Sequence, residues 1–92
     1  MRLQNCSRVV TLMTFTCTVR LESTAIELRV SSELANSWQW SIRILNGVIL
    51  EKGVSTSRIA AQIAAQFRCD EQLRRAGLSR ADEFRWDQVL ED

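Results

Sequence analysis

The side chains that most often perform catalysis are scarce in this 92-residue sequence. Histidine is absent, so the chain cannot form a Ser-His-Asp or Cys-His arrangement. Carboxylates occur as neighbouring pairs at 70–71, 82–83 and 91–92, where a solvated helix face or terminus explains them. The three cysteines, Cys6, Cys17 and Cys69, lack the CxxC spacing of zinc and redox sites. We therefore predict that the protein is not an enzyme and has no cofactor and no metal site. We also predict a cytoplasmic protein whose thiols are reduced. Cys17 is expected to be a small core residue.

Composition places the chain among ordinary globular proteins. Apolar residues make up 46% of it and charged residues 25%. This length predicts one domain over residues 1–92, with residues 1–8 frayed. The net charge of +1 supplies no general attraction to nucleic acid or to an anionic membrane, so either role would need a local patch. The apolar run at 9–19 is too short to span a bilayer, and we predict no membrane partner.

The elements around residues 38–67 carry the strongest structural signals. Apolar residues alternate from Trp38 to Ile44, and Asn46-Gly47 suits a two-residue hairpin turn before a return strand. In that register Ile44 pairs with Ile49 and Ile42 meets Glu51, a conflict that a bulge or a strand end near Glu51-Lys52 would remove. Hydroxyls at 55–57 then cap a helix over about 57–75, closed by Gly77. The helix is expected to face the sheet with the stripe Ile59, Ile63 and Phe67 beside Ala60 and Ala64.

Two further strands precede this unit, and one short helix follows it. Residues 13–21 and 26–31 alternate as a first hairpin in which Leu21 faces Ile26 and Val19 faces Leu28. Ser79 to Asp82 resembles a capping box for a helix over about 80–90. The predicted fold is α+β (ββββαα): a four-stranded antiparallel β-meander, a long amphipathic helix on one face and a short, peripheral C-terminal helix.

The opposite face of this sheet is expected to be polar. Arg20, Arg29 and Arg43 project from neighbouring strands there and would suit phosphates or an acidic protein surface. The alternative is a solvated face whose charge Glu27 partly offsets. The whole face is expected to carry Thr14, Thr16, Thr18, Arg20, Glu27, Arg29, Gln39, Ser41 and Arg43.

The C-terminal segment offers a candidate protein-binding site. Phe84 and Trp86 are two positions apart, so a helix would expose one of them. An exposed aromatic residue flanked by Arg80 and Arg85 has the composition of an interface. The alternative is that the helix wraps a corner of the domain and buries both rings.

Homodimerisation through an edge strand is a third binding mode. The strand at 13–21 carries no charge before Arg20, so as an unpaired edge it would invite a second copy. The alternative is that this strand lies inside the sheet or is covered by the N-terminus.

Residues 40–68 resemble the small bacterial YegP-type domain of unknown function. The shared features are an aromatic-x-aromatic strand, the Asn46-Gly47 turn, the Ile49-Leu50 return strand, Thr56-Ser57-Arg58 and a helix with Ala60 or Ala61 followed by Ile63-Ala64. The resemblance covers about a third of the chain and requires a one-residue gap in the return strand. It implies a fold and no activity.

These observations favour a non-enzymatic protein-binding module that acts as an inhibitor or adaptor on a larger protein or protein complex. A phage- or mobile-element-encoded inhibitor of the anti-CRISPR kind fits this profile. The alternatives are a nucleic-acid-binding protein that uses the Arg-bearing sheet face, or a subunit that completes an oligomer.

Overall fold

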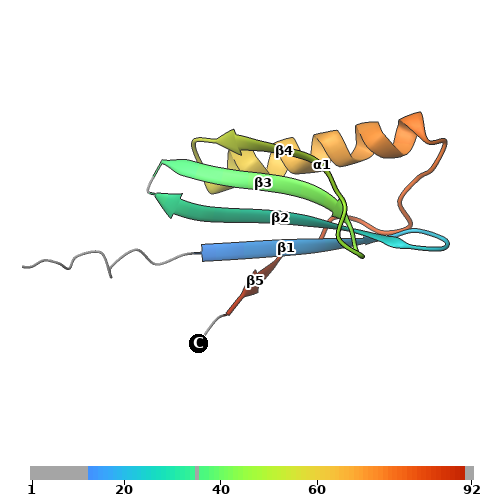
Figure 1. The fold of residues 1–92 in the computed structure, drawn as a ribbon, viewed down its shortest axis with the longest axis horizontal. Helices are drawn as coiled ribbons and strands as arrows, with labels where there is room; N and C mark the ends of the chain where they lie inside the picture. Colours follow the sequence, from blue (N-terminus) through green and yellow to red (C-terminus); the bar gives the residue numbers. More distant parts are fainter. Residues whose placement is uncertain (1–12, 35, 91–92) are drawn as a thin grey trace, which may run out of the picture.

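A computed structural model describes residues 13–34 and 36–90 of the chain. Its antiparallel sheet has five strands in the order β4-β3-β2-β1-β5, and one helix lies along the sheet (Figure 1). The elements in chain order are β1 (Met13–Arg20), β2 (Ala25–Leu34), β3 (Ser37–Ile44), β4 (Ile49–Ser55), α1 (Arg58–Arg75) and β5 (Asp87–Val89). The predicted α+β class, the four-stranded meander and the long helix on one face are confirmed.

The first hairpin forms with a tighter register than predicted. Val19 pairs with Ile26, whereas Leu21 was expected opposite Ile26. Leu21 instead belongs to the turn, where its N–H donates to the carbonyl of Thr24 at 2.9 Å. The shift is two residues, and an even shift keeps every side chain on its predicted face because strand side chains alternate.

The second hairpin turns one residue earlier than a simple Asn46-Gly47 turn. The N–H of Gly47 donates to the carbonyl of Ile44 at 2.8 Å, which puts Leu45 and Asn46 at the centre. Gly47 has a φ of 122°, a conformation that glycine adopts without a steric penalty. The predicted pairing of Ile44 with Ile49 is therefore wrong.

A bulge on the return strand follows from this turn. Arg43 pairs with Ile49 and Ile42 pairs with Glu51, so Leu50 is the extra residue. A bulge is thus present directly before Glu51, but it does not remove the pairing of Ile42 with Glu51 as predicted. In a regular strand Ile49 and Glu51 would lie on the same face of the sheet. The bulge places Ile49 on the polar face while Glu51 stays on the face that α1 covers.

The helix supplies the partners that Glu51 needs opposite Ile42. Arg68 Nε lies 2.6 Å from Glu51 Oε2, and Gln72 Nε2 lies 3.1 Å from Oε1. Partial burial by itself would raise the pKa of Glu51, but the hydrogen bonds from Gln72 and Arg68 outweigh it and hold the pKa below the usual 4.5. These contacts tie β4 to α1.

Lowering the pH should remove the contribution of this ion pair. A carboxylate with a depressed pKa in the folded state stabilises the fold above its usual pKa, and that stabilisation is lost as the pH falls below about 4.5. Urea denaturation at pH 7 should show the Glu51→Gln variant less stable by at most about 1 kcal/mol, since the pair is partly exposed. At pH 3 the difference should shrink toward zero. A difference that grew on acidification would contradict the depressed pKa.

Both ends of α1 follow the sequence signals. Ser57 is the N-cap, and its hydroxyl accepts from the N–H of Ala60 at 3.1 Å. At the other end Gly77 has a φ of 73° and the N–H of Leu78 donates to the carbonyl of Leu73 at 2.8 Å, a Schellman arrangement. The predicted cap and C-terminal glycine are confirmed.

The face that α1 turns toward the sheet differs from the prediction. Ile59, Ile63 and Phe67 are 58%, 59% and 59% exposed, whereas they were expected in the core. The buried stripe is Ala61, Ala65, Cys69 and Leu73, which also repeats every four residues. The helix therefore packs with its small side chains.

The side chains of the sheet explain why α1 packs against it through Ala61, Ala65 and Cys69. Leu28, Val30 and Ile42 are fully buried, and Trp40 lies against Gly53, where an added Cβ would meet the indole at 2.5 Å. These large groups fill the layer between sheet and helix, so only small residues of α1 fit above them. The buried core is Cys17, Val19, Ile26, Leu28, Val30, Trp40, Ile42, Ala61, Ala65, Cys69 and Leu73.

The predicted C-terminal helix is wrong. Residues 79–86 have no regular secondary structure, and β5 then pairs antiparallel with residues 14–16 of β1. In an extended segment, residues two apart point to the same side, so the spacing of Phe84 and Trp86 suits a chain lying along the core better than a helix. We call residues 79–86 the C-terminal strap.

Candidate protein-binding surfaces

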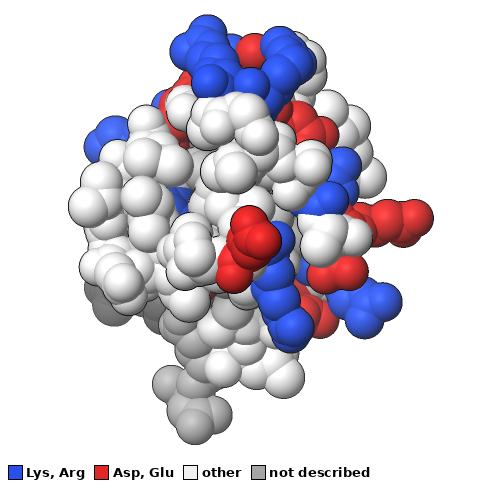
Figure 2. Space-filling model, turned by 90° about the vertical axis from the view of Figure 1, so that its right-hand side faces the viewer, with Lys and Arg blue, Asp and Glu red and all other residues white. Residues whose placement is uncertain are grey.

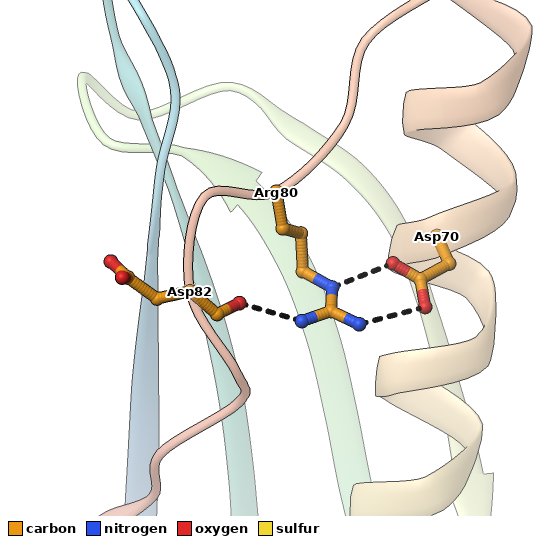
Figure 3. Close-up of polar contacts among 3 residues, drawn as sticks. All are labelled: Asp70, Arg80 and Asp82. Carbon is orange, nitrogen blue, oxygen red and sulfur yellow. Dashed lines mark hydrogen bonds and ion pairs between the residues drawn. The ribbon is translucent and has the colours of Figure 1, made fainter.

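Arg80 anchors the C-terminal strap to α1. Its Nε lies 2.8 Å from Asp70 Oδ1, its Nη2 lies 3.4 Å from Asp70 Oδ2, and its Nη1 donates to the carbonyl of Asp82 at 2.6 Å (Figure 3). The guanidinium also lies over the Phe84 ring, 3.9 Å from the ring centroid. Arg80 was predicted to contact a partner, but its donors are engaged inside the molecule.

Phe84 and Trp86 are also directed inward. Both are partly buried and pack against the core, and Trp86 Nε1 donates to Gln66 Oε1 of α1 at 2.7 Å. Arg85, between them, is exposed. Both rings therefore cover the core from an extended strap, an arrangement that neither helical alternative described. Of the four residues predicted at this site, only Arg85 is exposed.

The described cysteines are suited to packing and not to reaction. Cys17 and Cys69 are free and buried. Burial raises the pKa of the Cys17 thiol, and burial together with the neighbouring Asp70 raises the pKa of Cys69 to about 11. A thiol held protonated is a poor nucleophile and a poor metal ligand. The prediction that Cys17 is a small core residue is confirmed, and Cys6 lies outside the described residues.

Ile59, Ile63 and Phe67 form an apolar stripe that sequence reasoning had placed in the core. We call these three residues the outer face of α1. Each has more than half of its surface exposed, and their four-residue spacing aligns them along one side of the helix. The parallel repeat of small residues at 61, 65 and 69 was the signal that could have revealed this orientation. Contiguous large apolar groups on a protein surface often mark an interaction site.

The end of α1 adds basic charge next to this outer face. Arg74 and Arg75 lie in the last turn, and no acidic residue occupies the first turn. Glu71 pairs with Arg74 at 2.5 Å, while no described ion pair involves Arg75. Figure 2 views this end of the molecule and shows basic side chains, with acidic ones beside them, gathered where α1 finishes.

The polar sheet face has the residues that the sequence predicted for it. The strand registers place three rows across β1 to β4, and we call this surface the open face because α1 lies on the other side. Glu27 Oε1 lies 3.0 Å from Arg43 Nε and 3.8 Å from Arg29 Nε. Arg29 and Arg43 are thus partly neutralised, and Arg20 lies at the end of β1. The rows are Thr14-Ser31-Gln39-Val54, Thr16-Arg29-Ser41-Lys52 and Thr18-Glu27-Arg43-Ile49.

The sheet edges are poor sites for a second copy to add a strand. β1 is covered by β5 at residues 14–16, so the predicted free edge is reduced to its second half. The outer edge of β4 carries Lys52 and the bulge at Leu50, two features that discourage strand addition. The cover is β5, and the predicted cover by the N-terminus lies outside the described residues.

A hollow of about 620 Å³ lies between β1 and the C-terminal strap. Its acidic residues, Asp82, Glu83 and Asp87, are all exposed, and Arg20 and Arg85 also line it. Among the described side chains, no group of three His, Cys, Asp or Glu could hold a metal ion. Within residues 13–34 and 36–90, no helix is long and apolar enough to cross a membrane.

Comparisons with known proteins returned no family model, no curated protein and no solved structure that matches this chain. The YegP-type resemblance of residues 40–68 therefore stays a prediction. The surfaces described above are the basis for a functional assignment.

Proposed function

We propose that this chain is a non-enzymatic protein-binding module that inhibits or adapts a larger protein by inserting the outer face of α1 into an apolar groove. The observation that carries the proposal is the exposure of Ile59, Ile63 and Phe67, at 58%, 59% and 59%. Three large apolar groups at four-residue spacing match the anchors by which helices are recognised in grooves.

The shape of this surface favours a groove over a flat partner. A helix is convex, and α1 lies as a separate layer on the sheet (Figure 1). Stable interfaces bury about 800 Å² on each partner. The outer face of α1 would bury less area than this against a flat surface, because only its three side chains would touch the partner. A groove would also contact the residues on either side of the outer face. A second copy of α1 is equally convex and would bury less.

Charge further defines the partner. Arg75 has no described ion-pair partner and lies at the end of the helix that holds Phe67. Opposite charge at a rim improves steering and register more than affinity. We therefore expect the groove to be apolar along Ile59 to Phe67 and acidic at the end that meets Arg75.

The proposal predicts that Ile63→Asp abolishes capture of the partner. A charge at the centre of an apolar stripe should cost about 2–4 kcal/mol of binding, the range of an interface hot spot. The measurement is an affinity pull-down of tagged protein from lysate of the natural host, with nuclease added to half of the sample. One protein recovered in a stoichiometric amount and lost with Ile63→Asp is the expected result.

Val48→Asp is the matched control. Val48 is 63% exposed in the turn between β3 and β4, so the substitution introduces the same charge at similar exposure outside α1. Thermal denaturation should show both variants folded. Equal loss of the partner in both variants, or retention by Ile63→Asp, would reject this surface. A dimer in solution that Ile63→Asp dissociates would identify a second copy as the occupant and contradict the larger partner.

A further inference from the structure

The open face contains a hollow of about 590 Å³ on the side of the sheet opposite α1. The hollow forms because Ser31 and Ser41, on neighbouring strands, have short side chains and are surrounded by longer ones. Strand registers place both serines on the open face with Gln39. The hollow is lined by Arg29, Ser31, Gln39, Trp40, Ser41, Ile49, Lys52, Gly53 and Val54.

Two cations flank the centre of this hollow. Ser41 pairs with Arg29 on one side and with Lys52 on the other, so the two cations lie in one row across three strands. Neighbouring strands are about 4.8 Å apart, which separates the two Cα atoms by about 10 Å. Both side chains are long enough to lean over the serine between them. An anion above Ser41 would therefore be within reach of both.

The acidic side chain nearest in register lies outside the hollow. Glu27 belongs to the adjacent row and is not among the lining residues. It pairs with Arg43 at 3.0 Å and is more distant from Arg29, at 3.8 Å. Among the described side chains, no ion pair involves Lys52. The hollow thus combines two cations with hydroxyl and amide donors and no carboxylate.

We propose that this hollow binds a phosphate group, bridged by Arg29 and Lys52 and hydrogen-bonded by Ser31, Ser41 and Gln39. Forked guanidinium and ammonium donors are the usual phosphate ligands. Ile49 and Val54 border the site and would contact the organic part of a phosphate ester.

The positions of the aromatic rings indicate which part of a phosphate-containing ligand the hollow would recognise. Phe15, Trp38 and Trp40 lie on the side of α1, and Phe67, Phe84 and Trp86 belong to α1 or the C-terminal strap. Trp40 is the aromatic residue that lines this hollow, and it is only 9% exposed. The hollow therefore offers no exposed ring on which a nucleic-acid base could stack, the contact that usually holds single strands. Recognition would act on the phosphate, whether it belongs to a small ester or to a nucleic-acid backbone.

The test is an amide chemical-shift titration of the full chain with inorganic pyrophosphate and, separately, with a twelve-nucleotide oligothymidylate. Shifts are expected at the amides of Ser31, Gln39 and Ser41. Arg29→Gln and Lys52→Gln should each weaken binding about tenfold, because each removes one charge-assisted contact. Arg20→Gln is the control, since Arg20 is an exposed cation of the same sheet face outside the hollow.

The two ligands distinguish the sources of the phosphate. Binding of pyrophosphate alone would indicate a small phosphate ester. Binding of the oligonucleotide at the same residues would indicate a nucleic-acid backbone. A variant that carries both Arg29→Gln and Lys52→Gln should then lower the salt slope by about 0.7, because one phosphate group is no longer neutralised and its counterions are not released. Absence of shifts with both ligands, or binding that Arg29→Gln and Lys52→Gln leave unchanged, would overturn the proposal. Neither outcome depends on the outer face of α1, so this test and the pull-down fail independently.

Discussion

Deletion of residues 79–92 is expected to destabilise the domain strongly. The deletion removes Phe84 and Trp86 from the core surface and β5 from the edge of β1. Two half-buried aromatic side chains contribute about 1–1.5 kcal/mol each, and the hydrogen bond from Trp86 to Gln66 about 1 kcal/mol. The loss of about 3–4 kcal/mol compares with a total stability of roughly 5–10 kcal/mol for a chain of this size.

Thermal denaturation followed by circular dichroism would measure this effect. One kcal/mol shifts the Tm of so small a domain by about 4–8 °C, so we expect a fall of at least 10 °C. A chain that ends at Val89 is the control, because it keeps the C-terminal strap and β5 and loses from the described residues only Leu90, which is 85% exposed. Equal Tm values for the two truncated chains would contradict the role of the strap.

The sequence predicted a peripheral C-terminal helix. Deletion of such a helix would leave the sheet folded and abolish only the capture of the partner. The contacts of Arg80, Phe84 and Trp86 with α1 and the core make the same segment part of the fold. A truncation is therefore unsuited to locating a binding site in this chain, and point substitutions on exposed residues are preferable.

Ala65→Leu is expected to destabilise the domain, whereas Ile63→Ala should have almost no effect. Ala65 has no exposed surface and lies where α1 contacts the sheet, so a larger side chain must displace the helix. Overpacking of this kind costs about 1–3 kcal/mol. Ile63 is 59% exposed, and alanine has the better helix propensity, so its replacement should change the free energy of unfolding by less than about 0.5 kcal/mol.

Urea denaturation of both variants would measure the two free energies of unfolding, with the slope of each transition checked for two-state behaviour. The informative result is which of the two substitutions lowers the free energy of unfolding more. If Ile63→Ala cost more than Ala65→Leu, α1 would present its large stripe to the sheet, and the outer face would not exist.

Much of the local structure could be predicted from the sequence. Alternation between residues 13 and 44 identifies three strands, because strand side chains point to opposite faces in turn. The bounds of α1 follow from Ser57 and Gly77, whose capping geometry depends on local backbone alone. The polar residues at 14, 16, 18, 27, 29, 39, 41 and 43 were placed correctly on the open face, because the register error in the first hairpin was even. Ser31 and Lys52 were not in that prediction.

Which side of α1 faces the sheet was decided only by tertiary structure. The helix carries two stripes with the same spacing, one large (Ile59, Ile63, Phe67) and one small (Ala61, Ala65, Cys69). Hydrophobicity alone favours the large stripe. The space left above Leu28, Trp40 and Ile42 admits the small one, and that space depends on side chains from other strands.

The C-terminal segment and the phosphate hollow were likewise decided by contacts distant in sequence. β5 has three residues, too few to form a strand without β1, which lies about seventy residues earlier in the chain. The register in which Ile42 meets Glu51 already places Lys52 opposite Ser41, but only the register of β2 against β3 brings Arg29 beside the same serine. Sequence alone determined β1 to β4 and α1, because their patterns are local. Close packing between distant residues decided the form of the C-terminal segment, which faces are buried and which are free to bind.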